Sequence, residues 1–305
     1  MTIIVLEGPD LAGKTTLARS LAGSLTNVEM LRQGPPPRGV DILEHYLRPI
    51  QDWCYEPMTN RPRWLVLDRW HVGELFYGPL LRDKSLLTGQ QADYIDMVLN
   101  TFGCNFTYVT QPTAVLKRRW NERGDGLIKR EWLDDLAFDY EYWMNQRPHW
   151  VRHEFSHPNA FGVGHPSPMA GSYIGPRNPK VLLLGDERAD HRFVFPFVPA
   201  RATSGHWLMG AMHEAEVNHM NVGILNACER DAIAVYDQWY ALGRPHVITL
   251  GRNAEKQWKR ARMYSPQSEW DEKSHYLNHP QYERRFHYLR MKEYGQKIKD
   301  VMENE

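Results

Sequence analysis

The hydrophobic positions of the N-terminal half fall into short runs of consecutive apolar residues. Three runs, Ile3–Leu6, Trp64–Leu67 and Phe106–Val109, have the composition of strands that are buried on both faces of a parallel sheet. Helical spacing is found between and after them, at 15–22, 40–54, 90–101, 112–123 and 130–146. Because strands alternate with helices, the pattern predicts an α/β domain with a parallel sheet and helices on both faces.

The pattern breaks at a stretch rich in Pro and Gly, and a second set of elements then begins. Buried strands are expected at 180–185, 222–225 and 246–251, and helices at 204–217, 230–242, 252–262 and 281–302. A chain of 305 residues has room for about two domains. We therefore expect a first domain at 1–152, a linker at 153–179 and a second α/β domain at 180–305.

The segment Gly8–Thr15 matches the pattern Gly-x-x-x-x-Gly-Lys-Thr between the first predicted strand and the first predicted helix. Gly8 and Gly13 allow backbone N–H groups to surround a phosphate, and the helix N-terminus adds positive potential. In such a loop Lys14 reaches the β- and γ-phosphates of a nucleoside triphosphate, and Thr15 ligates Mg²⁺. The alternative is a chance match in an ordinary turn, but strand, loop and helix occur here in the required order.

Two charged residues, Asp68 and Arg69, directly follow the second predicted strand. The carboxyl ends of parallel strands meet at one edge of a sheet, so this pair is expected beside the phosphate loop. A carboxylate at that place suits a metal ion or a catalytic role, and a guanidinium suits an anion. The alternative for the pair is a surface ion pair.

Together, these N-terminal motifs resemble those of the thymidylate-kinase-like P-loop kinases over about residues 1–147. The resemblance rests on Leu6–Thr16, Asp68–Trp70, Phe76–Gly78 and Arg118–Gly124. It implies ATP and Mg²⁺, with Gly8, Gly13, Lys14, Thr15, Thr16, Arg119 and Arg123 on the donor side, and with Asp10, Arg69 and Phe76 near the acceptor. The sequence departs from the family in three ways: Leu11 replaces the usual Gly, Gly73 replaces the usual Ser, and the arginine-rich lid is short. The alternative for the lid arginines is a solvated helix face.

Short motifs of the second half resemble, in their order, the uracil-DNA glycosylase superfamily over about residues 174–300. They are Gly185–Ala189, Pro196-Phe197, Ser204–Leu208, an Asn-Val strand end at Asn221-Val222, Leu250–Ala254 and Leu277–Pro280. The resemblance implies recognition of a base or of DNA, with Asp186, Asn278 and His279 in contact with the substrate. The first motif lacks the family's usual Pro, so glycosylase chemistry is not carried onto Asp186 or Glu187, and His279-Pro280 could also be only a turn.

Charge and composition narrow the class of partner. The 37 Lys and Arg balance the 37 Asp and Glu, which argues against a protein that coats a polyanion over its whole surface. Residues 252–299 nevertheless hold 12 Lys or Arg and 6 Asp or Glu, with aromatic residues at Trp258, Tyr264, Trp270, Tyr276, Tyr282 and Tyr288. Cations mixed with aromatic faces are typical of surfaces that bind single strands or flipped bases. The alternative is a solvated helix whose aromatic residues belong to the core.

Cysteine usage and hydropathy bear on the compartment. Cys54, Cys104 and Cys228 lie far apart and are odd in number, which excludes a disulfide framework and fits a reducing cytoplasm. No apolar run approaches the roughly 18 residues of a membrane span. The first residues lack a basic n-region, so no signal peptide is expected. We expect a cytoplasmic protein, in the host cytoplasm if a phage encodes it.

These motifs predict transfer of a phosphoryl group from ATP and leave three interpretations of the acceptor and of the second half. In the first, the acceptor is the hydroxymethyl group of 5-hydroxymethyluracil in DNA, as in phage hypermodification of thymine; an alcohol needs a carboxylate base, for which Glu7, Asp10 or Asp68 is available. In the second, it is a free pyrimidine nucleotide such as dTMP. In the third, the second half is a DNA-binding or oligomerisation module without a base pocket. We favour the first, because a flipped base needs a surface to hold it, which gives the second half a task.

Overall fold

The computed structural model describes residues 2–55, 64–124, 128–154, 173–186, 193, 195–264, 273–286 and 290–303. The chain divides into two compact units, residues 1–92 with 103–165, and residues 93–102 with 166–305. Most of the predicted linker, at 155–172, lies outside the described residues. No helix of the described part is both long enough and apolar enough to cross a membrane.

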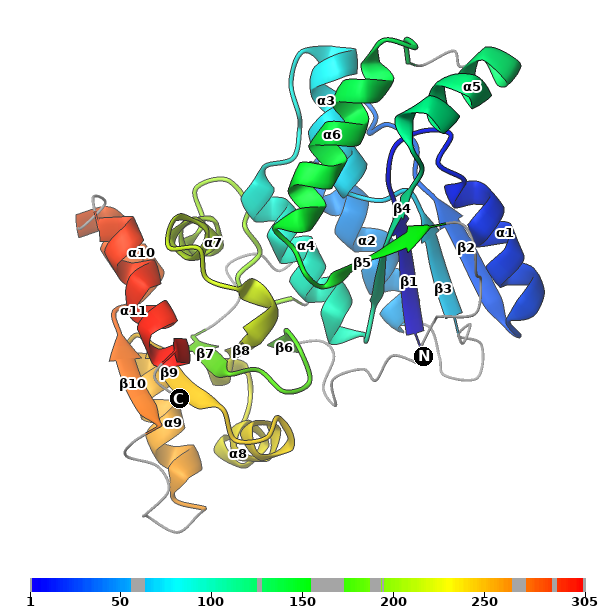
Figure 1. The fold of residues 1–305 in the computed structure, drawn as a ribbon. Helices are drawn as coiled ribbons and strands as arrows, with labels where there is room; N and C mark the ends of the chain where they lie inside the picture. Colours follow the sequence, from blue (N-terminus) through cyan, green and yellow to red (C-terminus); the bar gives the residue numbers. More distant parts are fainter. Residues whose placement is uncertain are drawn as a thin grey trace. The chain divides into compact units, whose positions relative to one another are not determined.

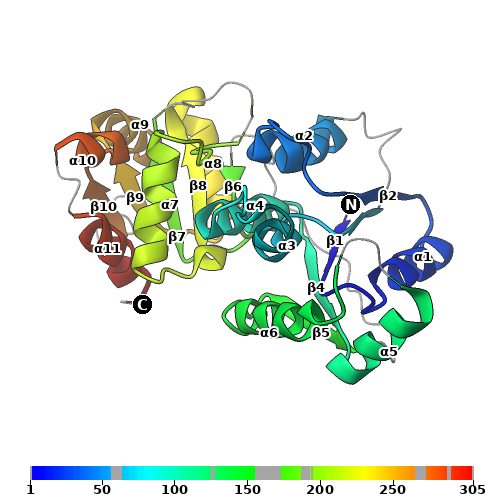
Figure 2. The same cartoon turned by 90° about the horizontal axis from the view of Figure 1, so that it is seen from above.

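The first unit contains a five-stranded parallel sheet in the order β2-β3-β1-β4-β5 (Figure 1). Its strands are β1 (Thr2–Glu7), β2 (Val28–Arg32), β3 (Trp64–Asp68), β4 (Asn105–Thr110) and β5 (Trp150–Glu154). Its helices are α1 (Lys14–Ser24), α2 (Ile42–Tyr55), α3 (Val72–Arg82), α4 (Gly89–Thr101), α5 (Thr113–Arg123) and α6 (Trp132–Asn145), of which α4 ends within the second unit. Helices lie on both sides of the strands (Figure 2), so the predicted α/β architecture is confirmed.

The second unit contains a second five-stranded sheet, in the order β10-β9-β7-β8-β6. Its strands are β6 (Tyr173–Ile174), β7 (Val181–Gly185), β8 (Val222–Asn226), β9 (His246–Leu250) and β10 (Ser274–Leu277), all parallel except β6. Its helices are α7 (Ser204–Glu214), α8 (Ala232–Ala241), α9 (Arg252–Arg262), α10 (Pro280–Phe286) and α11 (Met291–Glu303), with 3₁₀ turns η1 (His219–Asn221) and η2 (Ala227–Glu229). Helices α7 and α11 pack together on one side of this sheet, and α8 and α9 pack together on the other (Figure 2).

The strands that the hydrophobic runs did not reveal lie at or near the edges of the two sheets. β2, β5 and β10 are edge strands whose exposed sides carry polar or accessible residues, such as Val151 at 66% exposure. An edge strand is only partly buried, so it lacks a continuous apolar run. The segment Asn221-Val222, which we expected at a strand end, lies at a strand start instead: Asn221 ends η1, Val222 begins β8, and Asn226 ends that strand.

Helix α3 was also missed, because its sequence contains residues that disfavour a helix. Gly78 and Pro79 lie within it. The glycine is required by packing, since a Cβ at Gly78 would lie 2.7 Å from Glu74 Oε1 and 2.8 Å from the Cα of Ser85. The close approach allows the α3 backbone to fold over the side chain of Glu74, which becomes part of the site below.

Candidate active site

The loop between β1 and α1 is built on backbone conformations that favour glycine. Gly8 has a φ of +143°, and a Cβ there would lie 2.0 Å from the carbonyl oxygen of Val109. Gly13 has a φ of +106° and forms the N-cap of α1. Leu11 also has a positive φ, +66°. This is the position at which the thymidylate-kinase-like P-loop kinases usually have Gly. A leucine in this region is strained, and such strain is typical of functional loops.

Lys14 is held inside this loop by the loop's own carbonyl groups. Its side chain is buried, and Nζ donates hydrogen bonds to the carbonyl oxygens of Gly8, at 2.6 Å, and Pro9, at 2.7 Å. Burial, together with repulsion from Arg69 and against the attraction of nearby carboxylates, lowers the pKa of Lys14 to about 8. The ammonium group therefore keeps its proton at neutral pH and loses it at moderately alkaline pH.

The lowered pKa of Lys14 predicts how ATP binding depends on pH. A bound phosphate favours the protonated amine, so ATP affinity should change little below about pH 8 and should fall by up to about tenfold per pH unit above it. Calorimetric titration with ATP, repeated in two buffers of different ionisation enthalpy, should show proton uptake near pH 8.5. In Lys14→Arg the cation does not titrate in this range, so this dependence should disappear. A pH dependence that is equal in both proteins would contradict the assignment.

Thr15 and Asp68 form a pair of oxygen ligands at the start of α1. Thr15 Oγ1 donates to Asp68 Oδ2 at 2.7 Å, and Arg32 Nε lies 3.9 Å from the same oxygen. Asp68 is fully buried at the end of β3, and its Oδ1 accepts no hydrogen bond from the described residues. Mg²⁺ binds carboxylate and hydroxyl oxygens together with water and phosphate. The pair therefore fits Mg²⁺, as the sequence predicted for these two residues.

Glu7, at the end of β1, is engaged by the backbone that follows β3. Its carboxylate is fully buried, and Oε1 accepts from the N–H groups of Trp70 at 2.8 Å, Val72 at 3.0 Å and Gly73 at 3.3 Å. A carboxylate is favourable at a helix N-terminus, and these donors stand at the start of α3. Glu7 is therefore a positioning residue that fixes α3 against β1.

Asp10 and Arg69 form an ion pair beside the phosphate loop. Arg69 Nη2 contacts Asp10 Oδ1, and the Asp10 carboxyl group is 2% exposed. The backbone N–H of Asp10 donates to Tyr77 Oη at 2.9 Å. Arg69 has a φ of +67°, a conformation that is rare for a side chain of this size and that persists at functional sites.

A cavity of about 280 Å³ opens between these residues. Its aromatic walls are Tyr46, Trp70, Tyr77 and Tyr140, and its charged residues are Glu7, Asp10, Arg32, Arg69, Glu74 and Arg82. Burial, with the neighbouring carboxylates adding to it, raises the pKa of Tyr77 and of Tyr140 well above the ordinary value, so both phenols keep their protons. The cavity therefore combines flat apolar surfaces with hydroxyl and carboxylate groups next to the phosphate loop.

Sequence reasoning missed several residues of this cavity. The Glu74 carboxylate is buried and pairs with Arg82, and it also accepts from the N–H of Leu86 at 2.9 Å. Both charged residues belong to the unrecognised helix α3. The predicted acceptor contact Phe76 does not line the cavity; its ring packs against Tyr140, with centroids 4.6 Å apart, while the next residue, Tyr77, faces the cavity.

The predicted lid arginines differ in their placement. Arg119 Nη1 donates to the carbonyl oxygen of Leu11 at 2.7 Å, which ties α5 to the phosphate loop. Arg123 is exposed at the end of α5, and residues 125–127 lie outside the described part. Thr16 is exposed in the first turn of α1. Within the described part of the chain, Arg119 is thus the predicted lid arginine that contacts the phosphate loop.

In the second unit, the predicted contacts occupy one edge of the sheet, after β7 and β10. Asp186 Oδ1 accepts from the N–H of Ala254 at 2.9 Å and thereby caps α9. The Asn278 amide donates to Glu283 Oε1 at 2.8 Å and accepts from the Tyr276 hydroxyl at 3.3 Å. These side chains have structural partners, and their predicted contact with a substrate stays a prediction.

His279 also has a structural role at this edge. Its Nδ1 accepts from the N–H of Gln281 at 3.2 Å, which leaves the ring proton on Nε2. Burial lowers the pKa of His279, while Asp186 acts in the opposite direction, so the neutral ring is favoured. Gly251, with a φ of +100°, makes room for it, since a Cβ there would lie 3.1 Å from His279 Cβ. The ring of Phe197 lies nearby, with centroids 6.0 Å apart.

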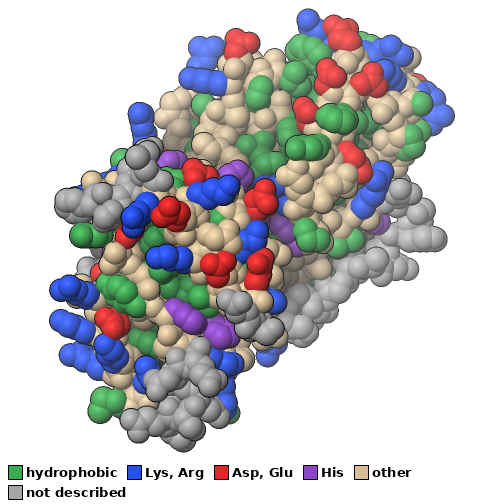
Figure 3. Space-filling model, turned by 60° about the vertical axis from the view of Figure 1, so that its left-hand side comes forward, with side chains coloured by type: hydrophobic (Ala, Val, Ile, Leu, Met, Phe, Trp, Pro, Cys, Tyr) green, Lys and Arg blue, Asp and Glu red, His purple; other side chains and the backbone are tan. Residues whose placement is uncertain are grey.

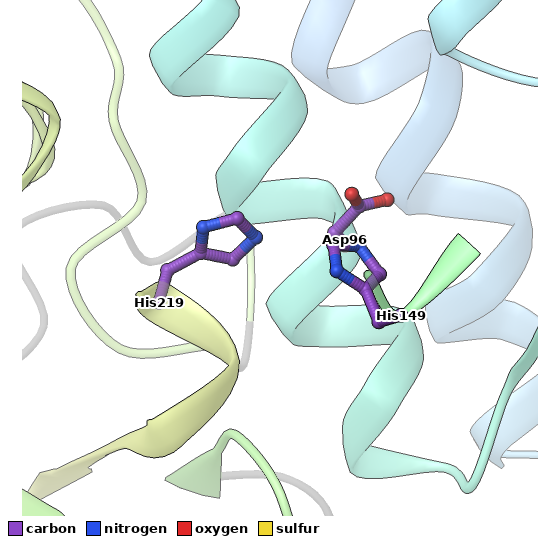
Figure 4. Close-up of side chains that lie close together, drawn as sticks. All are labelled: Asp96, His149 and His219. Carbon is purple, nitrogen blue, oxygen red and sulfur yellow. The ribbon is translucent and has the colours of Figure 1, made fainter. Parts of the chain in front are cut away.

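An acidic and a histidine side chain also approach each other elsewhere in the second unit. Figure 4 labels Asp96 on α4 and His219 in η1, whose ligand atoms lie within 4.8 Å of one another. His149, labelled in the same view, belongs to the first unit. Structural zinc sites use four protein ligands and catalytic ones three, so the pair within the second unit assigns no metal.

No protein-family model matches the chain. The SPbeta prophage-derived uncharacterized protein YorR of Bacillus subtilis (strain 168) is 26% identical over 152 residues, covering 48% of this chain and 83% of that protein. The crystal structure of YorR from Bacillus subtilis in complex with phosphorylated GDP is 22% identical, with a TM-score of 0.41, and the match covers 53% of this chain and 88% of that one. Deoxyadenosine kinase from M. mycoides, solved with dCMP and dCDP, is 17% identical with a TM-score of 0.30, over 50% of this chain and 90% of that one.

Each of these three matches covers about half of the present chain. The strand, glycine loop and helix at residues 2–24 have the order and geometry of a P-loop, and the parallel sheet has helices on both faces. The first unit therefore has the α/β fold of P-loop kinases. The second unit is a further α/β sheet.

Proposed function

We propose that the protein is an ATP-dependent kinase whose acceptor is the hydroxymethyl group of 5-hydroxymethyluracil in DNA. The observation that carries the proposal is the cavity beside the phosphate loop, which pairs aromatic walls with the Asp10 carboxylate. Aromatic faces stack on bases, and an alcohol acceptor benefits from a carboxylate base. Both features stand next to the loop that would hold the γ-phosphate.

The charges of the cavity favour a neutral acceptor group over a phosphate. The lining contains the carboxylates of Glu7, Asp10 and Glu74 and the guanidinium groups of Arg32, Arg69 and Arg82, a formal sum of zero. Arg69 and Arg82 are each paired with a carboxylate inside the cavity. A phosphate monoester carries about two negative charges and needs cations that are not already neutralised. A hydroxymethyl group needs none.

The residues of the site divide the reaction between them. Lys14 leaves the carbonyl groups of Gly8 and Pro9 and binds the β- and γ-phosphates of ATP. Thr15 and Asp68 would hold Mg²⁺, which would supply positive charge beside the transferring phosphoryl group. Asp10 accepts the proton of the acceptor hydroxyl; the hydroxyl oxygen forms a bond to the γ-phosphorus, the bond to the bridging oxygen breaks, and ADP leaves.

The second unit would hold the DNA that carries the base. A base inside a duplex is out of reach of a kinase loop, so it must leave the stack. The resemblance to uracil-DNA glycosylases at Asp186, Asn278 and His279 supports this task, and these residues share the carboxyl edge of the second sheet. If the second unit is instead a DNA-binding module without a base pocket, the protein should bind modified and unmodified DNA equally well.

A second candidate function is the phosphorylation of a free pyrimidine nucleotide such as dTMP. The observation in its favour is Arg32, whose side chain is 57% exposed and lies 3.9 Å from Asp68. An arginine that is so loosely held could turn toward a phosphate at the mouth of the cavity.

The test supplies [γ-³²P]-ATP and Mg²⁺ with three acceptors in separate reactions. They are DNA that contains 5-hydroxymethyluracil, free 5-hydroxymethyl-dUMP and free dTMP, with unmodified DNA of the same sequence as the control. We expect label on the modified DNA and none on the unmodified DNA. Label on free nucleotides alone would replace the first proposal with the second. No label on any acceptor would remove both.

A further inference from the structure

Helix α9 of the second unit presents a row of cations and one aromatic ring to solvent. Arg252, Lys256 and Arg260 follow one another at four-residue intervals and are all exposed, and Tyr264 continues the interval just beyond the helix at 56% exposure. Residues four apart lie on the same face of a helix, about 6 Å apart along its axis. The opposite face, with Ala254, Trp258 and Ala261, is buried against the sheet.

These cations are not explained by ion pairs. Among the described residues, none of Arg252, Lys256 and Arg260 forms an ion pair, although Lys259 on the same helix pairs with Glu255 at 2.6 Å. The helix as a whole holds five Lys or Arg and one Glu. Lys and Arg side chains also gather along the lower left of the space-filling view (Figure 3). Within the described residues, the row therefore leaves three positive charges available to a partner.

Helix stability accounts for Arg260, which lies in the last turn of α9, but not for Arg252 at the other end of the row. Cations stabilise the last turn of a helix and destabilise the first, because the N-terminus carries a partial positive charge. Arg252 stands in the first turn of α9, directly after its N-cap Gly251. The favourable negative charge at this end is supplied by Asp186, which caps the N–H of Ala254. An arginine at this position costs stability, so its presence points to binding.

We propose that the row Arg252–Lys256–Arg260 and Tyr264 is a track for a single strand of DNA. In a single strand that stays stacked as in B-form DNA, phosphates repeat about every 3.4 Å along the axis, so cations about 6 Å apart reach every second phosphate. The exposed ring at the end of the row offers a face on which an unpaired base stacks. This proposal rests on the proposed DNA acceptor and assigns a particular surface that binds it. It requires neither ATP nor a modified base.

The test is binding of the full chain to a fluorescent, unmodified oligothymidylate, followed by anisotropy at several salt concentrations without ATP. The triple variant Arg252→Ala, Lys256→Ala, Arg260→Ala should lose roughly 100-fold in affinity at 0.1 M salt, and its slope of log Kd against log salt should fall by about 2. The matched control, Lys292→Ala, Lys297→Ala, Lys299→Ala, removes the same charge from α11 of the same unit. It should keep the original slope.

Two single variants sharpen the result. Tyr264→Ala should weaken binding by about tenfold with an unchanged salt slope, because stacking releases no counterions. Arg252→Glu should bind less tightly while its melting temperature stays equal or rises, as the helix dipole requires. Equal losses in the α9 and α11 triple variants, or equally tight binding of polyglutamate, would overturn the assignment. Because the oligonucleotide is unmodified and ATP is absent, failure of the kinase proposal leaves this result intact.

Discussion

Replacing Lys14 with methionine should reduce phosphoryl transfer to every acceptor by about 10³-fold or more without lowering the stability of the fold. The first part follows from the loss of a cation at the transferring phosphoryl group, where a single charged or hydrogen-bonding group contributes on this scale. Transfer is measured with labelled ATP, and stability by thermal unfolding of the ligand-free protein.

The second part follows from the pKa of Lys14. In the folded protein burial lowers this pKa to about 8, below its ordinary value of 10.5. Between these pH values the unfolded chain binds more protons than the folded one, so the lysine makes stability rise with pH across this window and destabilises the fold below it. Methionine removes a buried cation and keeps the volume, so the melting temperature at pH 7 should stay equal or rise.

A matched control distinguishes the loop lysine from a general loss of positive charge. Lys117→Met removes a lysine of α5 that pairs with Asp134 outside the phosphate loop. This variant should keep its transfer activity. Retained activity in Lys14→Met, or an equal loss in both variants, would remove the phosphate loop from the mechanism.

The strands of the fold could be predicted from the sequence where consecutive residues are all buried. β1, β7 and β8 are buried along their whole lengths, and their runs of apolar residues reveal them directly. Edge strands such as β2 and β10 meet solvent on one side, so polar residues interrupt their pattern. Local propensity likewise fails at α3, where tertiary packing around Glu74 overrides Gly78 and Pro79.

In the candidate site, too, residues that are close in the sequence could be predicted, and residues that only the fold brings together could not. The phosphate loop is contiguous, so its spacing alone assigns Lys14 and Thr15, and Asp68 follows from its place at a strand end. The cavity is assembled from β1, α2, α3 and α6, and no local pattern brings Tyr46, Glu74 and Tyr140 together. A contact predicted from a motif can also miss by one residue, as Phe76 and Tyr77 show, because neighbouring helical side chains point in different directions.

The predicted residues of the second unit show a further limit. Asp186 lies at the strand end where its motif placed it, and its carboxylate caps α9. A strand end collects both functional groups and helix caps, since the helices of an α/β sheet begin there. Sequence position therefore predicts where such a residue lies more firmly than what it does.

Asp10→Asn should lower kcat for a hydroxymethyl acceptor by 10²–10⁴-fold, on the order of a general base, while Mg²⁺ and ATP still bind. The amide keeps the shape of the carboxylate but accepts no proton. It also weakens the ion pair with Arg69, and breaking a buried pair costs roughly 3–5 kcal/mol of stability. The rate is measured under saturating ATP with 5-hydroxymethyluracil DNA, beside the unfolding temperature of the variant.

Glu74→Gln separates the chemical effect from the structural one. It breaks the other carboxylate–arginine pair of the same cavity, with Arg82, so it should cost similar stability and raise KM for the acceptor while kcat stays close to the original. A phosphate acceptor is already anionic and needs no base. If Asp10→Asn left kcat unchanged on every acceptor, or if Glu74→Gln lowered kcat as much, Asp10 would not be the base. The alcohol acceptor would then lose its main physical support.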